Sequence, residues 1–406
     1  MIRIGIIGMG YRGTIHFKNL LLREDVIVMA IVDPHYNEEE IKRWCNEKGK
    51  AVPALYSSQK GYHEMMSVHD IDGVILSVPW DLFTPILLEL LPYPCYIGVE
   101  ASSIDKIEDI ERLQKSYQAH NSEVMILENA CYHRDVMAVF QMVGKGLFGE
   151  LVHLRGGYEH DLRKVKFDEK FCFGPNAKHE ARWRTAHSLQ RNGDLYPSHG
   201  IGPIAYILDI NRGNRFVSIS SFASKSRGLG NYLKRHKGVD HLDAKLPWKL
   251  GDVITSTLTT QRGETIILTH NTNTSRPYSL GFRVQGTDGI WIQENGNHLH
   301  IESLGESVDW MENPDQILRQ HDAVCWKRYH KEAAKTVRHD MDFFVLNDFL
   351  LAVDSKTSPK FDIYDLLSWM AISPLSEESI KQGGLPIPFP DFTNEQWRSR
   401  ESFYKE

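Results

Sequence analysis

Arginine, tyrosine and histidine side chains gather in three polar stretches in the second half of this sequence. Residues 182–184 read Arg-Trp-Arg, residues 192–200 read Asn-Gly-Asp-Leu-Tyr-Pro-Ser-His-Gly, and residues 275–278 read Ser-Arg-Pro-Tyr. These side chains can hydrogen-bond to sugar hydroxyls and move protons near neutral pH. A lone tyrosine is usually a core residue, but a group on predicted loops indicates a binding site, because binding residues concentrate on loops. We therefore expect a sugar site built around Arg184, Tyr196, His199 and Tyr278.

A glycine motif near the N-terminus offers a second kind of chemistry. Gly8-Met9-Gly10-Tyr11-Arg12-Gly13 fits the spacing GxGxxG, directly follows a strand-like run and opens a helical segment. Such glycines allow a tight turn and close approach of the backbone to a pyrophosphate. Asp33 lies 20 residues after Gly13, where a carboxylate accepts both ribose hydroxyls and repels a 2′-phosphate. The motif thus predicts a dinucleotide site that favours NAD over NADP.

The ends of later strands should face the same cofactor, because ligands of open parallel sheets bind beyond the carboxyl ends of the strands. This rule selects Ser77 to Trp80, Glu100-Ala101 and Glu128-Asn129 as the expected wall of the nicotinamide pocket. A charged residue such as Glu100 at the end of a buried strand also needs a partner.

The segments that position these residues follow two different patterns along the chain. Short β-branched runs alternate with segments of helical spacing up to Leu127, which is typical of βαβ units in a doubly wound parallel sheet. Later runs follow one another with little helix between them, which indicates a mostly antiparallel sheet. The fold class is therefore α/β, with a Rossmann domain at residues 1–128 and an α+β substrate-binding domain at residues 129–406. The later runs are residues 216–223, 253–260, 265–270, 281–285 and 289–293.

Composition excludes several classes of protein. Lys plus Arg number 47 and Asp plus Glu number 53, and this net charge of −6 argues against nucleic acid or an anionic membrane as partner. The five cysteines form no CxxC pair, so we expect neither a disulfide framework nor a metal site. No apolar run approaches the roughly 18 residues of a membrane span. The sequence as written lacks an export signal, which predicts a cytoplasmic protein, or a periplasmic or secreted one if a signal was removed.

Two further expectations concern surfaces. The outer face of an antiparallel sheet often pairs with a copy of itself, so we expect a homo-oligomer. The basic stretch Lys225–Lys249 is interpreted as a lid, a subunit contact or a solvated loop.

Taken together, the motifs resemble a known family. The N-terminal motif followed by an antiparallel sheet is similar to the Gfo/Idh/MocA superfamily of nicotinamide-dependent sugar enzymes. Glu128-Asn129-Ala130-Cys131-Tyr132, the run at residues 192–200, Arg-Trp-Arg and Arg-Pro-Tyr-Ser resemble glycoside hydrolase family 109, the NAD-dependent α-N-acetylgalactosaminidases. The resemblance spans nearly the whole chain, and Tyr196 to His199 are its most specific part.

The resemblance implies two sets of site residues. It implies NAD contacts from Tyr11, Arg12, Asp33, Trp80, Asp81, Leu82, Phe83, Glu100, Ala101 and Asn129, besides Gly8, Gly10 and Gly13. It implies substrate contacts from Tyr158, Arg184, Tyr196, Pro197, Ser198, His199 and Tyr278.

Two departures from the family pattern affect the cofactor wall. Where the family has Trp-x-x-His, this chain has Trp80-Asp81-Leu82-Phe83, and where it has Glu-Val-Pro, this chain has Glu100-Ala101-Ser102. Dehydrogenases of the superfamily carry Glu-Lys-Pro there, and the absent lysine favours a hydrolase over a net dehydrogenase.

We hypothesise a glycosidase that cleaves terminal N-acetylgalactosaminides, or related hexosaminides, by transient oxidation, since NAD-dependent families are exceptions to the two-carboxylate rule. A hydride leaves C3 of the sugar while His199 or Tyr196 accepts the hydroxyl proton. Tyr132 then removes the C2 proton, the aglycone leaves, water adds and the hydride returns. The catalytic candidates are Tyr132, His199 and Tyr196. The alternatives are a net sugar or inositol dehydrogenase and a non-catalytic protein that binds NAD and sugar.

Overall fold

The computed structural model describes residues 1–120, 122–305, 307–337 and 340–405. These residues form two compact units. Unit 1 comprises Met1–Ser102, Glu108–Tyr132 and Cys325–Leu367, and unit 2 comprises Ser103–Ile107, His133–Val324 and Ser368–Glu406. We describe each unit by itself.

Unit 1 is built on a six-stranded sheet in which every pair of strands is parallel. The strand order is β3-β2-β1-β4-β5-β6, the doubly wound arrangement that the alternating runs predicted. The central strands consist of β-branched residues buried on both faces, such as Ile4 and Ile6 at 0% exposure. The strands are β1 (Ile2–Ile7), β2 (Val26–Val32), β3 (Ala54–Tyr56), β4 (Gly73–Leu76), β5 (Tyr96–Val99) and β6 (Glu123–Ile126).

Helices of unit 1 come from both ends of the chain. The N-terminal set is α1 (Tyr11–Leu20), α2 (Glu38–Glu47), α3 (Gly61–Val68), α4 (Trp80–Leu90), α5 (Ile107–Gln118) and the 3-10 turn η1 (Asn129–Tyr132). The C-terminal set is α12 (Val324–Ala333), α13 (Asp340–Ser355) and the first turn of α14 (Ile363–Lys381).

The return of α13 to unit 1 differs from the single boundary expected at residue 128. Phe349 on α13 is fully buried, and a Cβ atom added to Gly73 or Gly98 would lie 3.2 Å from its ring. The helix therefore packs directly on β4 and β5 where these strands carry glycine. The periodicity of a helix carries no information about which sheet the helix covers.

Unit 2 is built on an eight-stranded sheet of order β13-β12-β11-β7-β10-β9-β8-β14. The β7–β10 pair is parallel, and the other pairs among these strands are antiparallel, as predicted. The strands are β7 (Leu151–Glu159), β8 (Phe216–Ala223), β9 (Ile254–Thr260), β10 (Thr265–Asn271), β11 (Arg283–Gly286), β12 (Gly289–Gln293), β13 (Asn297–Ile301) and β14 (Ile387–Pro388).

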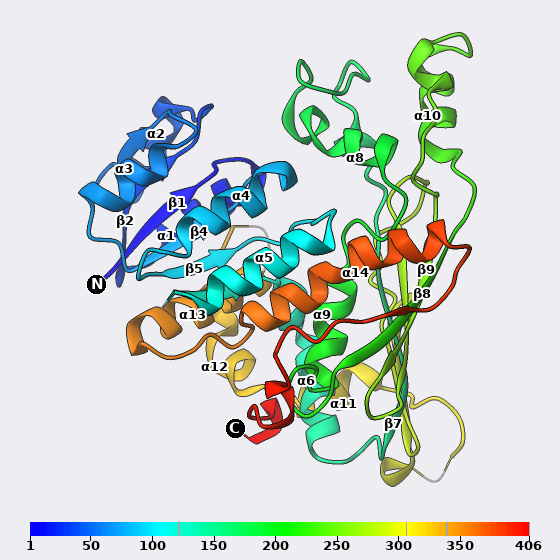
Figure 1. Cartoon of the computed structure of the whole chain (residues 1–406). Coiled ribbons are helices and arrows are strands. Elements are labelled where there is room, and N and C mark those ends of the chain that lie inside the picture. Colours follow the sequence, from blue (N-terminus) through cyan, green and yellow to red (C-terminus); the bar gives the residue numbers. More distant parts are fainter. Residues whose placement is uncertain (121, 306, 338–339, 406) are drawn as a thin grey trace. The chain divides into compact units, whose positions relative to one another are not determined.

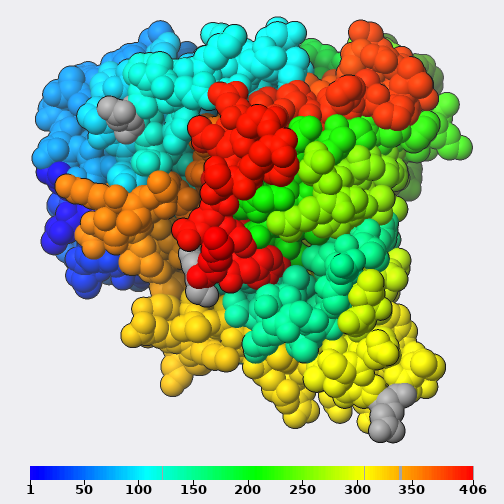
Figure 2. Space-filling model, turned by 60° about the horizontal axis from the view of Figure 1, so that its bottom comes forward, coloured from blue at the N-terminus to red at the C-terminus, as the bar shows by residue number. Residues whose placement is uncertain are grey.

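One face of the unit 2 sheet carries α9 (Ser198–Ile207), which packs on β7. The C-terminal segment follows the sheet edge, where β14 pairs with β8 and Phe389 packs against Phe216, and its red surface lies along the light green strands in Figure 2. Unit 2 also contains the part of α14 from Ser368 onward, and α6 (Arg134–Gly144), α8 (Arg184–Gln190), α10 (Gly228–Lys237) and α11 (Pro314–Gln320) (Figure 1). Its shorter helical segments are α7 (Arg163–Lys166), η2 (His179–Arg182), η3 (Leu242–Lys245), η4 (Glu302–Leu304), η5 (Gln396–Arg398) and η6 (Phe403–Lys405).

Within the described residues, no helix is long and apolar enough to cross a membrane. The same residues contain no group of three or more His, Cys, Asp or Glu side chains arranged to hold a metal ion.

Candidate functional site

The glycine motif forms the turn between β1 and α1 in unit 1. Gly8 has φ +93°, and a Cβ atom there would lie 2.0 Å from the carbonyl oxygen of Ser77. A Cβ atom at Gly13 would lie 1.9 Å from the carbonyl oxygen of Gly8, so both positions require glycine. At Gly10 a Cβ atom would meet nothing within 4 Å, which leaves open space above the turn. The turn and the N-terminus of α1 thus fit a phosphate group.

Asp33, at the end of β2, faces this turn. Its carboxylate accepts hydrogen bonds from the backbone N–H of Met9 and of His35, each at 2.6 Å. The acidic residue that the spacing predicted therefore lies beside the glycine motif. The two features together fit the pyrophosphate and ribose of a dinucleotide.

Arg12 is the centre of a buried charge network in unit 1. Its guanidinium donates to Glu100 at 3.0 Å and to both oxygens of Asp342 at 2.9 and 3.0 Å. Asn129 also donates to Asp342, at 2.8 Å, and His16 contacts Glu100. Burial opposes ionisation of Glu100, but Arg12 and His16 more than offset it and lower its pKa to about 2.

Three of the predicted cofactor residues, Arg12, Glu100 and Asn129, thus belong to one network. Sequence reasoning missed its two other members, His16 on α1 and Asp342 on α13. Two carboxylates engage the Arg12 guanidinium, and the Arg12 backbone N–H lies at the start of α1.

The four residues at the start of α4 differ in how much surface they offer to a cofactor. Asp81 is exposed and Leu82 is half-buried, so both offer surface near the end of β4. Trp80 is 7% exposed and Phe83 only 1% exposed. Phe83 therefore belongs to the apolar interior and offers no surface to a cofactor, unlike the histidine that the family pattern carries. Tyr11 is 52% exposed and Ala101 is half-buried.

Tyr132 lies in the interior of unit 1, at 1% exposure. Its hydroxyl donates to Asp348 at 2.7 Å, and its ring packs edge-on against Phe361 with centroids 5.9 Å apart. Its carbonyl oxygen accepts a hydrogen bond from Trp326 at 3.0 Å. The Tyr132 hydroxyl is engaged as a donor to Asp348, and the base role suggested by the sequence stays a prediction.

The predicted sugar residues come together in unit 2. Tyr158 is the last but one residue of β7, Tyr196 lies two residues before α9, and His199 is the second residue of α9. The three ring centroids lie 5.0 to 5.2 Å apart. Tyr278 adds a fourth ring 6.4 Å from Tyr158, and it is 54% exposed. We call these four residues, with Arg184, the aromatic site.

Glycines explain how β7 and α9 approach closely enough to build this site. A Cβ atom at Gly156 would lie 2.5 Å from the carbonyl oxygen of Gly200, and one at Gly200 would lie 2.6 Å from the backbone nitrogen of Gly157. Gly200 directly follows His199, and Gly157 directly precedes Tyr158. The contact of glycine backbones therefore brings these two side chains side by side.

Arg184, the first residue of α8, reaches the aromatic site from a different segment. Its guanidinium lies 5.7 Å from the Tyr196 ring and 5.0 Å from the Trp183 ring, and it donates to Glu180 at 2.5 Å. Burial opposes its charge, but Glu180, Tyr158 and Tyr196 raise the pKa of Arg184 above its usual range. It therefore remains a cation that can bind sugar oxygens.

Three residues near this site were missed by sequence reasoning. His160 is hydrogen-bonded to the Tyr158 hydroxyl at 3.1 Å, and its ring lies 5.0 Å from Tyr278. Burial and the nearby His199 and Arg184 lower the pKa of His160. Burial, Lys166 and Arg184 likewise lower the pKa of His270, at the end of β10, well below its usual range. Both imidazoles are thus kept neutral.

The third missed residue is Lys166, which is 3% exposed. Its ammonium donates to Thr272 Oγ1 at 2.7 Å and Asn273 Oδ1 at 2.6 Å. Burial and then Arg184 lower the pKa of Lys166 well below its usual range. Its carbonyl oxygen accepts from Thr185, the neighbour of Arg184. The polar stretch in which it lies gave no signal for these contacts.

The backbone between residues 193 and 198 is held from α14. The Asp194 backbone N–H donates to Ser376 Oγ at 2.9 Å, and Ser373 Oγ donates to the Asp194 carbonyl at 2.6 Å. Burial raises the pKa of Asp194 to about 7. Pro197 and Ser198 are buried, with Ser198 at 0% exposure, so neither residue offers surface to a substrate in this structure.

The fold and these two sites define a class: a doubly wound dinucleotide unit combined with a sheet unit that carries a sugar site. Residues 132–399 match the family model described as "Glycosyl hydrolase 109, C-terminal domain". A "Glycosyl hydrolase family 109 protein" of Stenotrophomonas maltophilia is 41% identical over 99% of this chain and 91% of its own. The chain belongs to glycoside hydrolase family 109 and is a glycosidase, which confirms the resemblance that its motifs indicated.

Other relatives agree with this assignment. An "Alpha-N-acetylgalactosaminidase" of Tannerella forsythia is 40% identical over 99% of this chain and 88% of its own. Among solved structures, a levoglucosan dehydrogenase in complex with NADH and L-sorbose aligns over 97% of this chain and all of its own, with TM-score 0.70 and 16% identity. An inositol dehydrogenase homolog from Azotobacter vinelandii aligns over 96% and 97%, with TM-score 0.66 and 14% identity. At such identities these structures show the fold alone.

Proposed function

We propose that this glycosidase removes terminal N-acetylgalactosamine from glycans with the help of tightly bound NAD. The observation that carries the proposal is the aromatic site, in which Tyr158, Tyr196 and His199 lie within 5.2 Å of one another beside Arg184. The substrate is proposed from the name of the Tannerella forsythia relative. The NADH of the levoglucosan dehydrogenase complex supports the cofactor, as do Gly8, Gly13 and Asp33 of this chain.

In this proposal the glycine turn and the N-terminus of α1 hold the pyrophosphate, and Asp33 holds the ribose. Bound NAD supplies reversible hydride transfer at a sugar carbon. The chain's own residues bind the sugar, hold its ring in one orientation and move protons at its hydroxyls.

Arg184 donates to sugar oxygens, since its charge is maintained by Glu180. The tyrosine rings offer apolar faces to the pyranose and hydroxyls to its edges. His199 or Tyr196 accepts the proton of the reacting hydroxyl. From Tyr158 a proton can pass to His160, which is hydrogen-bonded to the Tyr158 hydroxyl and kept neutral by burial and nearby cations.

The test uses a nitrophenyl α-N-acetylgalactosaminide in deuterated water, with purified enzyme and no added cofactor. We expect nitrophenol release, deuterium at C2 of the product sugar and no net NADH. In a parallel assay with added NAD+, steady NADH accumulation would identify a net dehydrogenase instead of a hydrolase, and binding without turnover would leave a sugar sensor. His199→Ala should lose most turnover, whereas His153→Ala, on the same strand as Tyr158 but outside the aromatic site, should not.

The expected oligomeric state and the expected location in the cell remain proposals. A homo-oligomer through the outer face of the unit 2 sheet is tested by light scattering of the purified protein. A cytoplasmic location is tested by fractionation of cells that express the full-length gene.

A further inference from the structure

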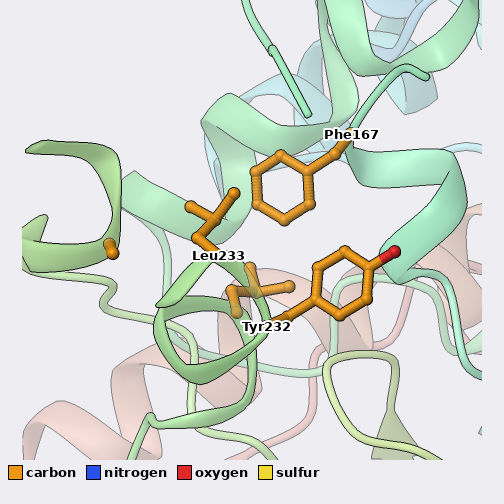
Figure 3. Close-up of a cluster of buried hydrophobic side chains, with 5 residues drawn as sticks. Phe167, Tyr232 and Leu233 are labelled. Atoms are coloured by element: carbon orange, nitrogen blue, oxygen red, sulfur yellow. The ribbon is translucent and has the colours of Figure 1, made fainter. Parts of the chain in front are cut away.

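One lobe of unit 2 combines two segments that are far apart in sequence, residues 161–191 and 225–250. We call it the basic lobe. A small apolar core of its own joins the segments, with Phe167 from the first packed against Leu229, Tyr232, Leu233 and Ala244 from the second (Figure 3). The Phe167 and Tyr232 rings are stacked with centroids 6.0 Å apart. The lobe is therefore an ordered part of unit 2.

The charge of this lobe is opposite to that of the protein. Its two segments contain fifteen Lys and Arg but six Asp and Glu, whereas the whole chain has 47 against 53. Eleven of the fifteen cations are exposed: Lys164, Lys170, Lys178, Arg182, Lys225, Arg227, Lys234, Arg235, Lys237, Lys245 and Lys249. The rest of the chain is correspondingly acidic, with 32 of the 47 Lys and Arg against 47 of the 53 Asp and Glu.

The last turn of α10 concentrates this charge. Lys234, Arg235 and Lys237 are all exposed. Within the described part of the chain, no carboxylate lies within ion-pair distance of any of the three. By contrast, the lysine at 245 is paired with Asp240 at 3.1 Å. The charge on α10 is thus available to an external anion.

The base of the lobe is continuous with the sugar site. Asp252 accepts hydrogen bonds from the backbone N–H of Arg227 at 2.8 Å and of Gly228 at 2.9 Å, where α10 begins. A Cβ atom at Gly228 would lie 2.1 Å from the carbonyl oxygen of Asn273, whose side chain binds Lys166. Arg184 itself belongs to the lobe. From this base α10 extends beyond the end of the unit 2 sheet (Figure 1).

We propose that the basic lobe binds carboxylate or sulfate groups on the part of a glycan that lies beyond the cleaved sugar. The inference rests on the proposed function and deepens it, because it identifies the natural substrates as acidic glycans. A chain whose terminal sugar occupies the aromatic site passes the base of the lobe, where long-range attraction favours anions. A long polyanion such as nucleic acid fits less well, because the surface outside the lobe would repel it.

The test compares an acidic oligosaccharide that carries one sulfate near its terminal N-acetylgalactosamine with the same oligosaccharide without sulfate. We expect kcat/KM for the sulfated substrate to be about tenfold higher at low salt, mainly through KM. Surface attraction is screened, so the ratio should approach one at high ionic strength.

The variant K234Q/R235Q/K237Q removes three cations from α10, and K48Q/K115Q/K335Q removes three exposed lysines of unit 1 as a matched control. The lobe variant should lower kcat/KM for the sulfated substrate about 3- to 10-fold, since exposed pairs contribute little each and the whole effect of the sulfate is about tenfold. Cleavage of the neutral nitrophenyl substrate should stay within twofold in both variants. Equal rates for both oligosaccharides, or an equal effect of both variants, would overturn the proposal.

Binding of the sulfated fragment without its terminal sugar, followed by calorimetry, separates this inference from the proposed function. Lobe-dependent binding supports the lobe even if the enzyme cleaves a different sugar. Tighter lobe-dependent binding of single-stranded DNA, or of vesicles with anionic lipid, would assign the surface to another partner and overturn the proposal.

Discussion

Replacing Arg12 by methionine removes the one guanidinium that balances Glu100 and Asp342 in unit 1. The two carboxylate side chains are 10% and 0% exposed, so the variant leaves two buried charges without their cation. Breaking a buried ion pair from one side costs about 3–5 kcal/mol. The pKa of Glu100, lowered from 4.5 to about 2, gives a similar figure of about 3 kcal/mol. We expect Arg12→Met to lower the free energy of unfolding by about this amount.

The pH dependence gives the sign of the effect. A carboxyl group whose pKa is lowered in the folded state stabilises it above the unfolded pKa, and this contribution is lost as the pH falls from 4.5 toward 2. In the variant the carboxylates are instead destabilising while ionised. The difference in stability between wild type and variant should therefore be largest near pH 7 and shrink toward pH 4.

Urea unfolding followed by tryptophan fluorescence measures the effect, and Arg43→Met is the control. Arg43 is 59% exposed, its partners Glu40 and Glu47 are exposed, and its contacts of 3.7 and 3.8 Å are long, so its loss should cost under about 1 kcal/mol. Arg12→Met combined with Asp342→Asn should recover part of the loss. If Arg12→Met is as stable as Arg43→Met at pH 7, the network does not hold unit 1 together.

Three further predictions concern other buried groups. Burial raises the pKa of Asp194 to about 7, so wild-type stability should fall as the pH rises from about 4 to about 7, because Asp194 ionises first in the unfolded chain. Asp194→Asn should make the melting temperature less dependent on pH over this range. An unchanged pH dependence of the melting temperature would contradict the assignment. Lys166→Met leaves Thr272 and Asn273 without their donor, which should lower the free energy of unfolding by about 1–3 kcal/mol. The same variant should raise KM more than it lowers kcat. Lys164→Met, at an exposed neighbouring position, should change neither stability nor kinetics. Tyr132→Phe should lower the melting temperature but retain C2 proton exchange, because the Tyr132 hydroxyl is a donor to Asp348. If the variant keeps wild-type stability but loses C2 proton exchange, Tyr132 is the base.

The fold of unit 1 was predictable because its strands are buried on both faces and its helices keep a clear period. Two elements of its N-terminal part were not predicted, β3 (Ala54–Tyr56) and α3 (Gly61–Val68). β3 is three residues long, half-buried and at the edge of the sheet. The place of α13 was also not predictable. Its Asp342 contacts Arg12 across 330 positions of sequence, and no local pattern encodes such a pair.

The candidate site was also predictable only in part. Tyr158, Arg184, Tyr196, His199 and Tyr278 come together as the motifs predicted. His160 and Lys166 lie in the long polar stretch, where residue types alone gave no reason to choose them. The close contact of Gly156 with Gly200 could have been suspected from paired glycines in a strand, but the partner helix could not.

The carboxylates around the aromatic site are paired with arginines, which indicates that unit 2 does not use the usual acid and base of a glycosidase. Ordinary glycosidases place two free carboxyl groups about the scissile bond. Here Glu159 is paired with Arg155 and Arg276, Asp161 with Arg163, and Glu180 with Arg184. Asp194, whose pKa burial raises to about 7, is only 3% exposed and accepts a hydrogen bond from the Tyr196 backbone N–H. The proton-exchanging side chains of the aromatic site itself are tyrosines and histidines, and the pKa of the neighbouring His160 is held low by burial and nearby cations. Such bases can take a hydroxyl proton but are poor donors to a leaving glycosidic oxygen, which is the situation that transient oxidation of the sugar relieves.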